Sequence, residues 1–205
     1  MQEEELTTIK RIHDTAKEEF LQKGFQSASL RNIVKKAGVT TGAFYGYYKS
    51  KEELFDALVK DGFDTFIGMY KKAQDDFTRL SPEEQLKNMG KISGECLQDM
   101  LKFAYENRDV FHLLLCSAEG TRYENMEHEM VEIEIEATHT FVNATKGVVN
   151  CEYNIDKALE HILVSGLFTA FFEMIIHDVP YEKATEYLEK LREFYTAGWQ
   201  KIMGF

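Results

Sequence analysis

The side chains best suited to contact a nucleic acid lie in residues 29–48, which read SLRNIVKKAGVTTGAFYGYY. This stretch holds hydroxyls, aromatic rings and cations, and no carboxylate. The acid-free segment extends from residue 20 to residue 51, although the whole chain has a formal net charge of −11. A carboxylate beside a phosphate weakens binding to a DNA backbone, so the loss of acids here favours a phosphate-facing surface.

The residues after Gly38 predict a short helix that is narrow at its start. Thr40 can cap this helix, and the small front of Thr41 and Gly42 would let it enter a major groove. The hydroxyl of Thr41 can bond a base edge, and its methyl group can contact thymine. Phe44, together with Tyr48 four residues on, would hold the helix against the core.

Three further side chains could contact phosphates. Tyr45 and Tyr47 carry hydroxyls on the same short helix, and Lys51 begins the next helix, where exposed backbone amides also favour an anion. The alternative for each residue alone is ordinary: aromatic rings at helical spacing usually fill a core, and lysines usually face water. The combination of residue types and order favours contact with DNA.

The hydrophobic periodicity predicts an all-α chain of about nine helices, since no stretch alternates with period two. Three short helices within the first 50 residues, two of them joined by a turn at Gly38, predict a helix-turn-helix domain at 1–50. Residues 51–205 would form a ligand-binding and dimerisation domain. The nine expected helices lie at about 6–23, 29–36, 41–47, 50–77, 81–107, 109–118, 122–146, 155–177 and 181–203.

These motifs resemble the N-terminal DNA-binding domain of the TetR family of transcriptional regulators. The resemblance covers residues 6–60, through FLQKGF (20–25), SLRNIVKKAGV (29–39) and TTGAFYGYYKSKEELF (40–55). It implies an all-helical homodimer with a variable C-terminal ligand domain. It also implies base and phosphate contacts at Thr41, Gly42, Tyr45, Tyr47 and Lys51.

The sequence departs from the family pattern at two positions. Ala43 stands where many members have a phosphate-contacting Thr or Ser, so that contact is expected to be missing. Asn32 replaces a common acid in the second helix, which weakens the capping box expected there.

The C-terminal part could contain a ligand pocket centred on Glu134. This acid lies between two apolar stripes of the 122–146 helix, where burial is costly without a partner. The sequence therefore predicts a pocket for a cationic or hydrogen-bonding ligand; the alternative is an acid at the edge of a packing seam. The candidate lining residues are Met100, Phe103, Phe111, Met130, Glu134, Phe141, Phe168 and Phe172.

The last two expected helices have the pattern of an association surface. Residues 159–177 are apolar nearly all round, and Gly166 and Ala170 would leave a narrow face for a second helix. Leu188, Leu191 and Tyr195 recur on one face of the final helix. Two such helices from each subunit would make a four-helix bundle and place two reading helices about 34–36 Å apart.

Composition argues against several other classes. The sequence has no nucleophile–base motif and no Gly-rich phosphate loop, so nothing in it suggests an enzyme. His112 and Cys116 are two possible ligands, which is too few for a metal site, so neither a metal nor a cofactor is expected. The N-terminus lacks a secretory h-region, no apolar run approaches a membrane span, and three scattered cysteines suit a reduced compartment. A cytoplasmic protein is expected.

The sequence thus predicts a ligand-responsive DNA-binding regulator. We expect a homodimeric repressor that a small-molecule effector releases from a palindromic operator in double-stranded DNA, without a membrane partner. The alternative is a DNA-binding regulator whose C-terminal domain responds to a protein partner.

Overall fold

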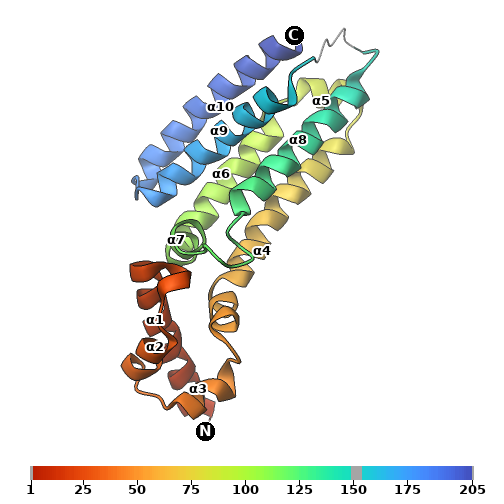
Figure 1. The fold of residues 1–205 in the computed structure, drawn as a ribbon. Helices are drawn as coiled ribbons and strands as arrows, with labels where there is room; N and C mark the ends of the chain where they lie inside the picture. Colours follow the sequence, from red (N-terminus) through yellow and green to blue (C-terminus); the bar gives the residue numbers. More distant parts are fainter. Residues whose placement is uncertain (1, 149–153, 205) are drawn as a thin grey trace. The chain divides into compact units, whose positions relative to one another are not determined.

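The computed structural model describes residues 2–148 and 154–204, with side chains from residue 5 onward, and these residues form ten helices and no strand (Figure 1). The all-α prediction is confirmed. The helices are α1 (Gln2–Ser27), α2 (Leu30–Lys36), α3 (Thr41–Tyr47), α4 (Lys51–Thr78), α5 (Pro82–Lys87), α6 (Lys91–Glu106), α7 (Arg108–Cys116), α8 (Met126–Thr145), α9 (Lys157–Ile176) and α10 (Tyr181–Met203).

Packing divides the chain into two compact units. The first contains residues 1–64 and 107–124, and the second contains residues 65–106 and 125–205. The boundary that we predicted after residue 50 lies inside the first unit, and as a division of function it stays a prediction.

Two glycines explain where the helices depart from the expected bounds. Gly90, at φ +73°, separates α5 from α6, where the sequence predicted one helix over 81–107. This left-handed backbone is strained for residues with a Cβ, so the chain turns here despite helix formers on both sides. The expected start at Ser81 is confirmed, with a complete capping box to Glu84. Gly24, at φ +72°, bends α1 near its end.

An aromatic cluster forms the core of the first unit. Phe20 and Phe25 of α1 pack against Phe55 of α4, with ring centroids 5.1 and 5.3 Å from that of Phe55. Phe44 of α3 is fully buried, as the sequence predicted. One side of the short helix α3 is therefore anchored in the core, which leaves its other side available.

The second unit packs around α9, which contacts both α8 and α10. Phe168, Phe171 and Phe172 of this helix are at most 1% exposed. By length and composition α9 could also cross a membrane, with a mean hydropathy of 1.6, so the expectation that no segment approaches a span was wrong on this measure. Its buried aromatic face is what the core helix of a folded bundle requires.

Candidate DNA-binding surface and ligand pocket

The face of α3 opposite Phe44 is open to solvent. Thr40, Thr41 and Gly42 are exposed at the start of the helix, and Tyr45 retains 52% of its accessible surface. Tyr47 is half-buried. The structure therefore brings the four predicted contacts of this helix, together with its cap Thr40, onto one short element, where all but Tyr47 are exposed.

The start of α3 is fixed by its own hydroxyl cap. The Thr40 Oγ1 accepts a hydrogen bond from the Ala43 backbone N–H at 3.1 Å. This bond satisfies one of the amides that a helix start leaves without a partner. The cap places Thr41 at the first turn, which is the part of a reading helix that reaches base edges.

The end of α3 is held by a contact with α1. The Tyr48 hydroxyl lies 2.5 Å from His13 Nε2, and the Tyr48 ring packs 5.8 Å from the Phe44 ring. Burial lowers the pKa of His13, with nearby Lys17 acting in the same direction. The neutral imidazole is therefore the form that suits this contact.

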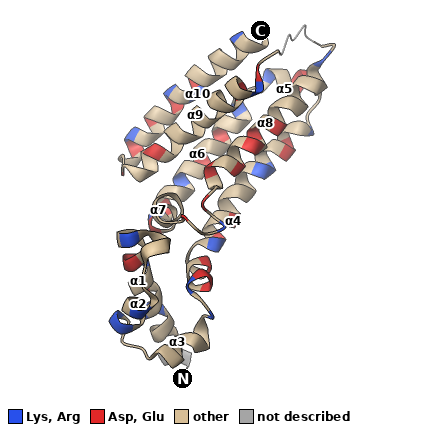
Figure 2. Cartoon of the chain, viewed as in Figure 1, with Lys and Arg blue, Asp and Glu red and all other residues tan. Residues whose placement is uncertain are grey.

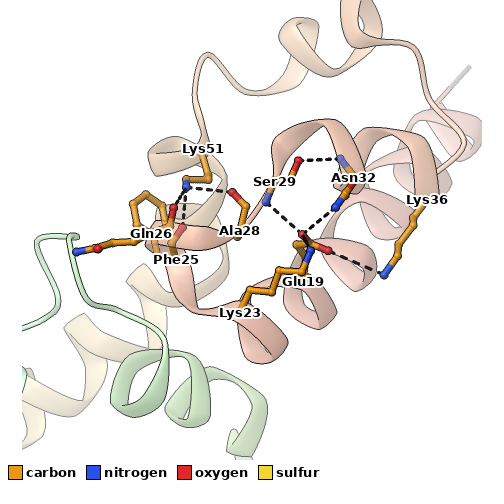
Figure 3. Close-up of polar contacts among 9 residues, drawn as sticks. All are labelled: Glu19, Lys23, Phe25, Gln26, Ala28, Ser29, Asn32, Lys36 and Lys51. Carbon is orange, nitrogen blue, oxygen red and sulfur yellow. Dashed lines mark hydrogen bonds and ion pairs between the residues drawn. The ribbon is translucent and has the colours of Figure 1, made fainter.

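A buried carboxylate on α1 organises the start of α2 (Figure 3). Glu19 is 1% exposed, and its Oε1 accepts bonds from Lys23 Nζ at 2.7 Å, the Ser29 backbone N–H at 3.2 Å and Asn32 Nδ2 at 3.3 Å. Lys36 Nζ lies 4.0 Å from its other oxygen. The Ser29 hydroxyl meanwhile accepts from the Asn32 N–H at 3.4 Å.

This arrangement supplies the capping acid from another helix. In a capping box the side chain three residues after the cap accepts the cap N–H. Here Glu19 accepts the Ser29 N–H, and Asn32 donates its own amide to Glu19. The hydrogen bond from Lys23 is the largest cause that lowers the pKa of Glu19. Local sequence patterns do not reveal this role of Glu19, because the bond joins α1 to a residue ten positions further on, at the start of α2.

Lys51 has a structural role that the sequence did not reveal. Its ammonium donates to the carbonyls of Phe25, Gln26 and Ala28 at 2.6, 3.1 and 3.2 Å, and lies 4.5 Å from the Phe25 ring centroid (Figure 3). An ammonium has three N–H donors, so these bonds use its full capacity. The phosphate contact predicted for Lys51 stays a prediction, and it would have to act through charge rather than a new direct bond.

The remaining cations of the acid-free segment face solvent. Arg31, Lys35, Lys36 and Lys49 are all exposed. Figure 2 shows the basic residues of α2 along that helix, without an acid between them. Exposed cations on α2 and beside α3 are suited to phosphate contact.

The second unit contains a cavity whose wall is mostly apolar. It is lined from α4 by Ala73, Gln74 and Phe77, from the α5–α6 turn and α6 by Met89, Gly90, Ile92, Ser93, Gly94 and Leu97, from α8 by Glu134, Ala137, Thr138 and Phe141, from α9 by Leu167, and from α10 by Arg192, Tyr195, Thr196, Trp199 and Met203. Convergent polar groups in an apolar wall are typical of a small-molecule site.

Glu134 lies on this wall, as the sequence predicted, but it has protein partners. Its Oε2 accepts from the Tyr70 hydroxyl and from Gln74 Nε2, the latter at 2.7 Å. Burial raises the pKa of Glu134, and it also raises the pKa of Tyr70 well above its usual range. The two neutral donors stabilise the Glu134 carboxylate, whereas burial favours its protonated form.

Most of the other predicted pocket residues belong to the packed core. Phe141 lines the cavity, whereas Phe103 is outside its wall. Five others are at most 1% exposed and also lie outside the wall: Met100, Phe111, Met130, Phe168 and Phe172. Of these, Phe111 belongs to the first unit. Their periodicity reflects helix packing, which uses the same apolar spacing as a pocket wall.

The predicted association residues are only partly exposed on α9 and α10. Leu188 is fully buried inside its own chain. Gly166 accommodates Tyr195 of the same chain, because a Cβ at Gly166 would lie 2.6 Å from the Tyr195 hydroxyl oxygen. Ala170 and Leu191 are half-buried. The large apolar side chains that α9 and α10 do expose are Leu159, Ile162, Tyr181, Tyr187, Phe194 and Ile202.

The packing of α1, α2 and the exposed helix α3 is that of a helix-turn-helix domain. Residues 12–58 match the family model of the bacterial regulatory proteins of the tetR family. Residues 12–58 therefore carry a DNA-binding domain of the TetR type.

Several known proteins resemble the chain in sequence or in fold. The chain is 30% identical over 79 residues, 38% of each chain, to the HTH-type transcriptional repressor KstR2 of Mycolicibacterium smegmatis, and so spans less than half of that relative. It is 26% identical over 165 residues, 80% of this chain and 70% of the other, to the HTH-type transcriptional regulator TtgR of Pseudomonas putida. The fold resembles that of NalD of Pseudomonas aeruginosa, the secondary repressor of the MexAB-OprM multidrug efflux pump, with a TM-score of 0.55 and 21% identity over 96% of this chain and 97% of that one.

Proposed function

We propose that the protein is a homodimeric DNA-binding transcriptional repressor whose affinity for a palindromic operator falls when a small molecule occupies the second unit. The observation that carries this proposal is the exposed, acid-free surface of α3, anchored by Phe44 within a TetR-family domain. The names of the relatives are those of transcriptional regulators rather than enzymes, which supports the same function. A cytoplasmic location follows from this proposal.

The reading function is tested by selecting bound sites from random duplex DNA. We expect a two-fold-symmetric motif, because two copies of α3 in a dimer read related half-sites. Thr41→Ala should change the preference at one base position in each half-site, at a cost of about 1–3 kcal/mol. Ser27→Ala, an exposed hydroxyl at the end of α1, is the matched control and should leave the motif unchanged. A protein that enriches no duplex sequence at modest salt would refute the proposal.

The dimer is proposed to form through the exposed apolar side chains of α9 and α10. Phe194 is 72% exposed and Ile162 is 64% exposed, which is costly for side chains of this size on a monomer. Phe194→Glu should give monomers by light scattering and abolish the two-fold character of DNA binding. Leu6→Glu makes the same change in charge at a 68%-exposed position on α1 and should leave the dimer intact. If the Phe194 variant stays dimeric, the interface lies elsewhere.

The ligand response is proposed because the second unit has an apolar cavity with two charged wall residues. A ligand shifts DNA affinity only if it binds the DNA-competent and DNA-free conformations differently. A protein partner in place of a small molecule was the alternative, and the cavity favours the small molecule. The test is release of fluorescent operator DNA by candidate ligands, with Leu97→Trp, which fills the wall, as an unresponsive variant.

A further inference from the structure

The cavity wall contains a guanidinium whose bonding capacity is largely unused. The Arg192 Nε is buried and has no hydrogen-bond partner in the described part of the chain. Its Nη2 donates one long bond, 3.4 Å, to the Gly90 carbonyl. A guanidinium has five N–H donors and carries its charge at all accessible pH values. Leaving the buried Nε–H donor without a partner is costly, so an acceptor is expected.

The neighbouring helix leaves space for this guanidinium. A Cβ at Gly94 would lie 1.9 Å from Arg192 Nε and 2.1 Å from its Cζ, so only glycine permits the contact. Glycine inside a helix such as α6 is less favourable than alanine. The placement of Arg192 against α6 therefore depends on a residue that is otherwise unfavourable there.

Protein carboxylates do not meet this need. Within the described residues, no Asp or Glu forms an ion pair with Arg192, and the other charged group on the wall, Glu134, receives its bonds from Tyr70 and Gln74. The rest of the wall is apolar or neutral, and its aromatic members are Phe77, Phe141, Tyr195 and Trp199. The site thus combines an unpaired cation with an apolar enclosure.

We propose that the cavity binds an apolar monocarboxylic acid, with the carboxylate on Arg192 and the hydrocarbon body against Phe77, Phe141 and Trp199. This inference rests on the proposed ligand response of the second unit. A planar guanidinium pairs with a carboxylate through two parallel bonds, which makes a carboxylate the best match for an unpaired Arg. The proposed ligand is an anion, whereas Glu134 alone suggested a cationic or hydrogen-bonding ligand.

The test uses the single tryptophan of the chain, Trp199, as a reporter inside the cavity. Decanoate, decan-1-ol and decylamine share one body and differ in the charge of the head; 4-phenylbutanoate and its alcohol and amine form a second set. Each is titrated below its aggregation limit while tryptophan emission is followed. Decanoate should bind about tenfold or more tighter than decanol, and decylamine should bind more weakly than either.

Two variants assign the preference to Arg192. Arg192→Gln should bring the acid to within about threefold of the alcohol while alcohol binding persists, and Gly94→Ala should have the same effect by displacing the guanidinium. Lys190→Gln, an exposed cation on the same helix, is the matched control. Thermal unfolding of each variant verifies that it is folded.

The outcomes separate this inference from the proposed function. Equal or tighter binding of the alcohol or amine, an acid preference that survives Arg192→Gln, or no emission change with any ligand would overturn the inference. Operator release is measured separately with the same compounds. Acid binding that leaves operator affinity unchanged would overturn the ligand response and leave the ligand class standing.

A second observation, independent of the cavity, concerns three side chains of α8 and α9. His128 and Glu132 are four residues apart on α8, and His161 comes from α9; one donor atom from each lies within 4.8 Å of the others. The His161 Nδ1 lies 3.3 Å from the Ser165 hydroxyl. A hydrogen bond at one ring nitrogen orients the ring and leaves Nε2 for a metal.

The geometry points to a site for a divalent transition metal of the zinc class, held by two imidazoles and one carboxylate. This donor set is typical of zinc sites that keep an open fourth position. Histidine spacing along the chain predicts no metal site, because His128 and His161 lie on different helices.

The metal site is tested on tag-free, chelator-treated protein. Calorimetry with Zn²⁺ should give one site per chain, and Co²⁺ should give the visible absorption of a low-coordinate complex. His161→Ala and His128→Ala should each weaken binding about tenfold or more. The control is His177→Ala, because His177 and Glu173 form a pair of the same spacing, 2.7 Å apart, without a third donor in the described residues. Equal losses in all variants, or none, would show an adventitious ion only.

Discussion

Replacing Glu19 by glutamine should destabilise the protein more than any other single neutralisation of an acid on α1. The carboxylate is 1% exposed and accepts three bonds, one of them from a lysine. A hydrogen bond to a charged group contributes about 1.5–3 kcal/mol, and glutamine keeps an acceptor oxygen, so a net loss of about 2 kcal/mol is expected. For a chain of this length that corresponds to a fall of about 4–8 °C in Tm.

The assay is urea and thermal unfolding of wild type, Glu19→Gln and Glu18→Gln. Glu18 is the exposed neighbour, so its variant makes the same change in net charge without the buried bonds. Glu19→Gln should also weaken operator binding, because the start of α2 loses its capping acceptor. Equal unfolding midpoints for the two variants would refute the reasoning.

The pH dependence of Glu19 gives a second check on the same residue. Its pKa is lowered in the folded state, so the unfolded chain binds the proton more readily in acid. The stabilisation is therefore present above the unfolded pKa, about 4.3, and is lost as the pH falls through the folded value. The difference in free energy of unfolding between wild type and Glu19→Gln should shrink below about pH 4. A difference that stays constant down to pH 3 would mean that the charge of Glu19 is not responsible.

Three further perturbations follow from other contacts. Lys51→Ala should lower Tm by removing three carbonyl bonds, and should reduce the salt slope of DNA binding by about 1 only if the charge also acts on a phosphate. The pKa of His13 is lowered in the folded state, so the wild type gains stability as the pH rises through about 6.5. His13→Gln should remove part of this gain. Unfolding at pH 5.5 and 7.5 checks this. Tyr123→Phe should cost about 1–2 kcal/mol in chemical unfolding, because the buried hydroxyl donates to Asp56 at 2.5 Å and accepts from Arg122 at 2.6 Å, and an unchanged midpoint would contradict it.

Periodicity and caps predicted every helix of the described residues except the division between α5 and α6. The predicted helix at 181–203 matches α10, and Ser81, Thr40 and Ser29 cap the helices assigned to them. These signals are local, so they can be read without the fold. The split at Gly90 was missed because a single glycine inside a helical pattern is also tolerated in helices.

The sites were harder to predict because they depend on contacts between helices. Glu134 was found from its place among apolar residues, but its partners Tyr70 and Gln74 lie more than fifty positions away. Arg192 gave no signal, since an Arg on an amphipathic helix usually faces water. Its role emerges only from the contact with Gly94.

The link from Glu19 to the start of α2 has a consequence for how the domain assembles. A helix of seven residues such as α2 does not hold its shape alone in water. Because its starting amide bonds a side chain of α1, the two segments must order together. A peptide cut to residues 29–48 should therefore be unstructured and bind no operator, even though it contains every residue proposed to read bases.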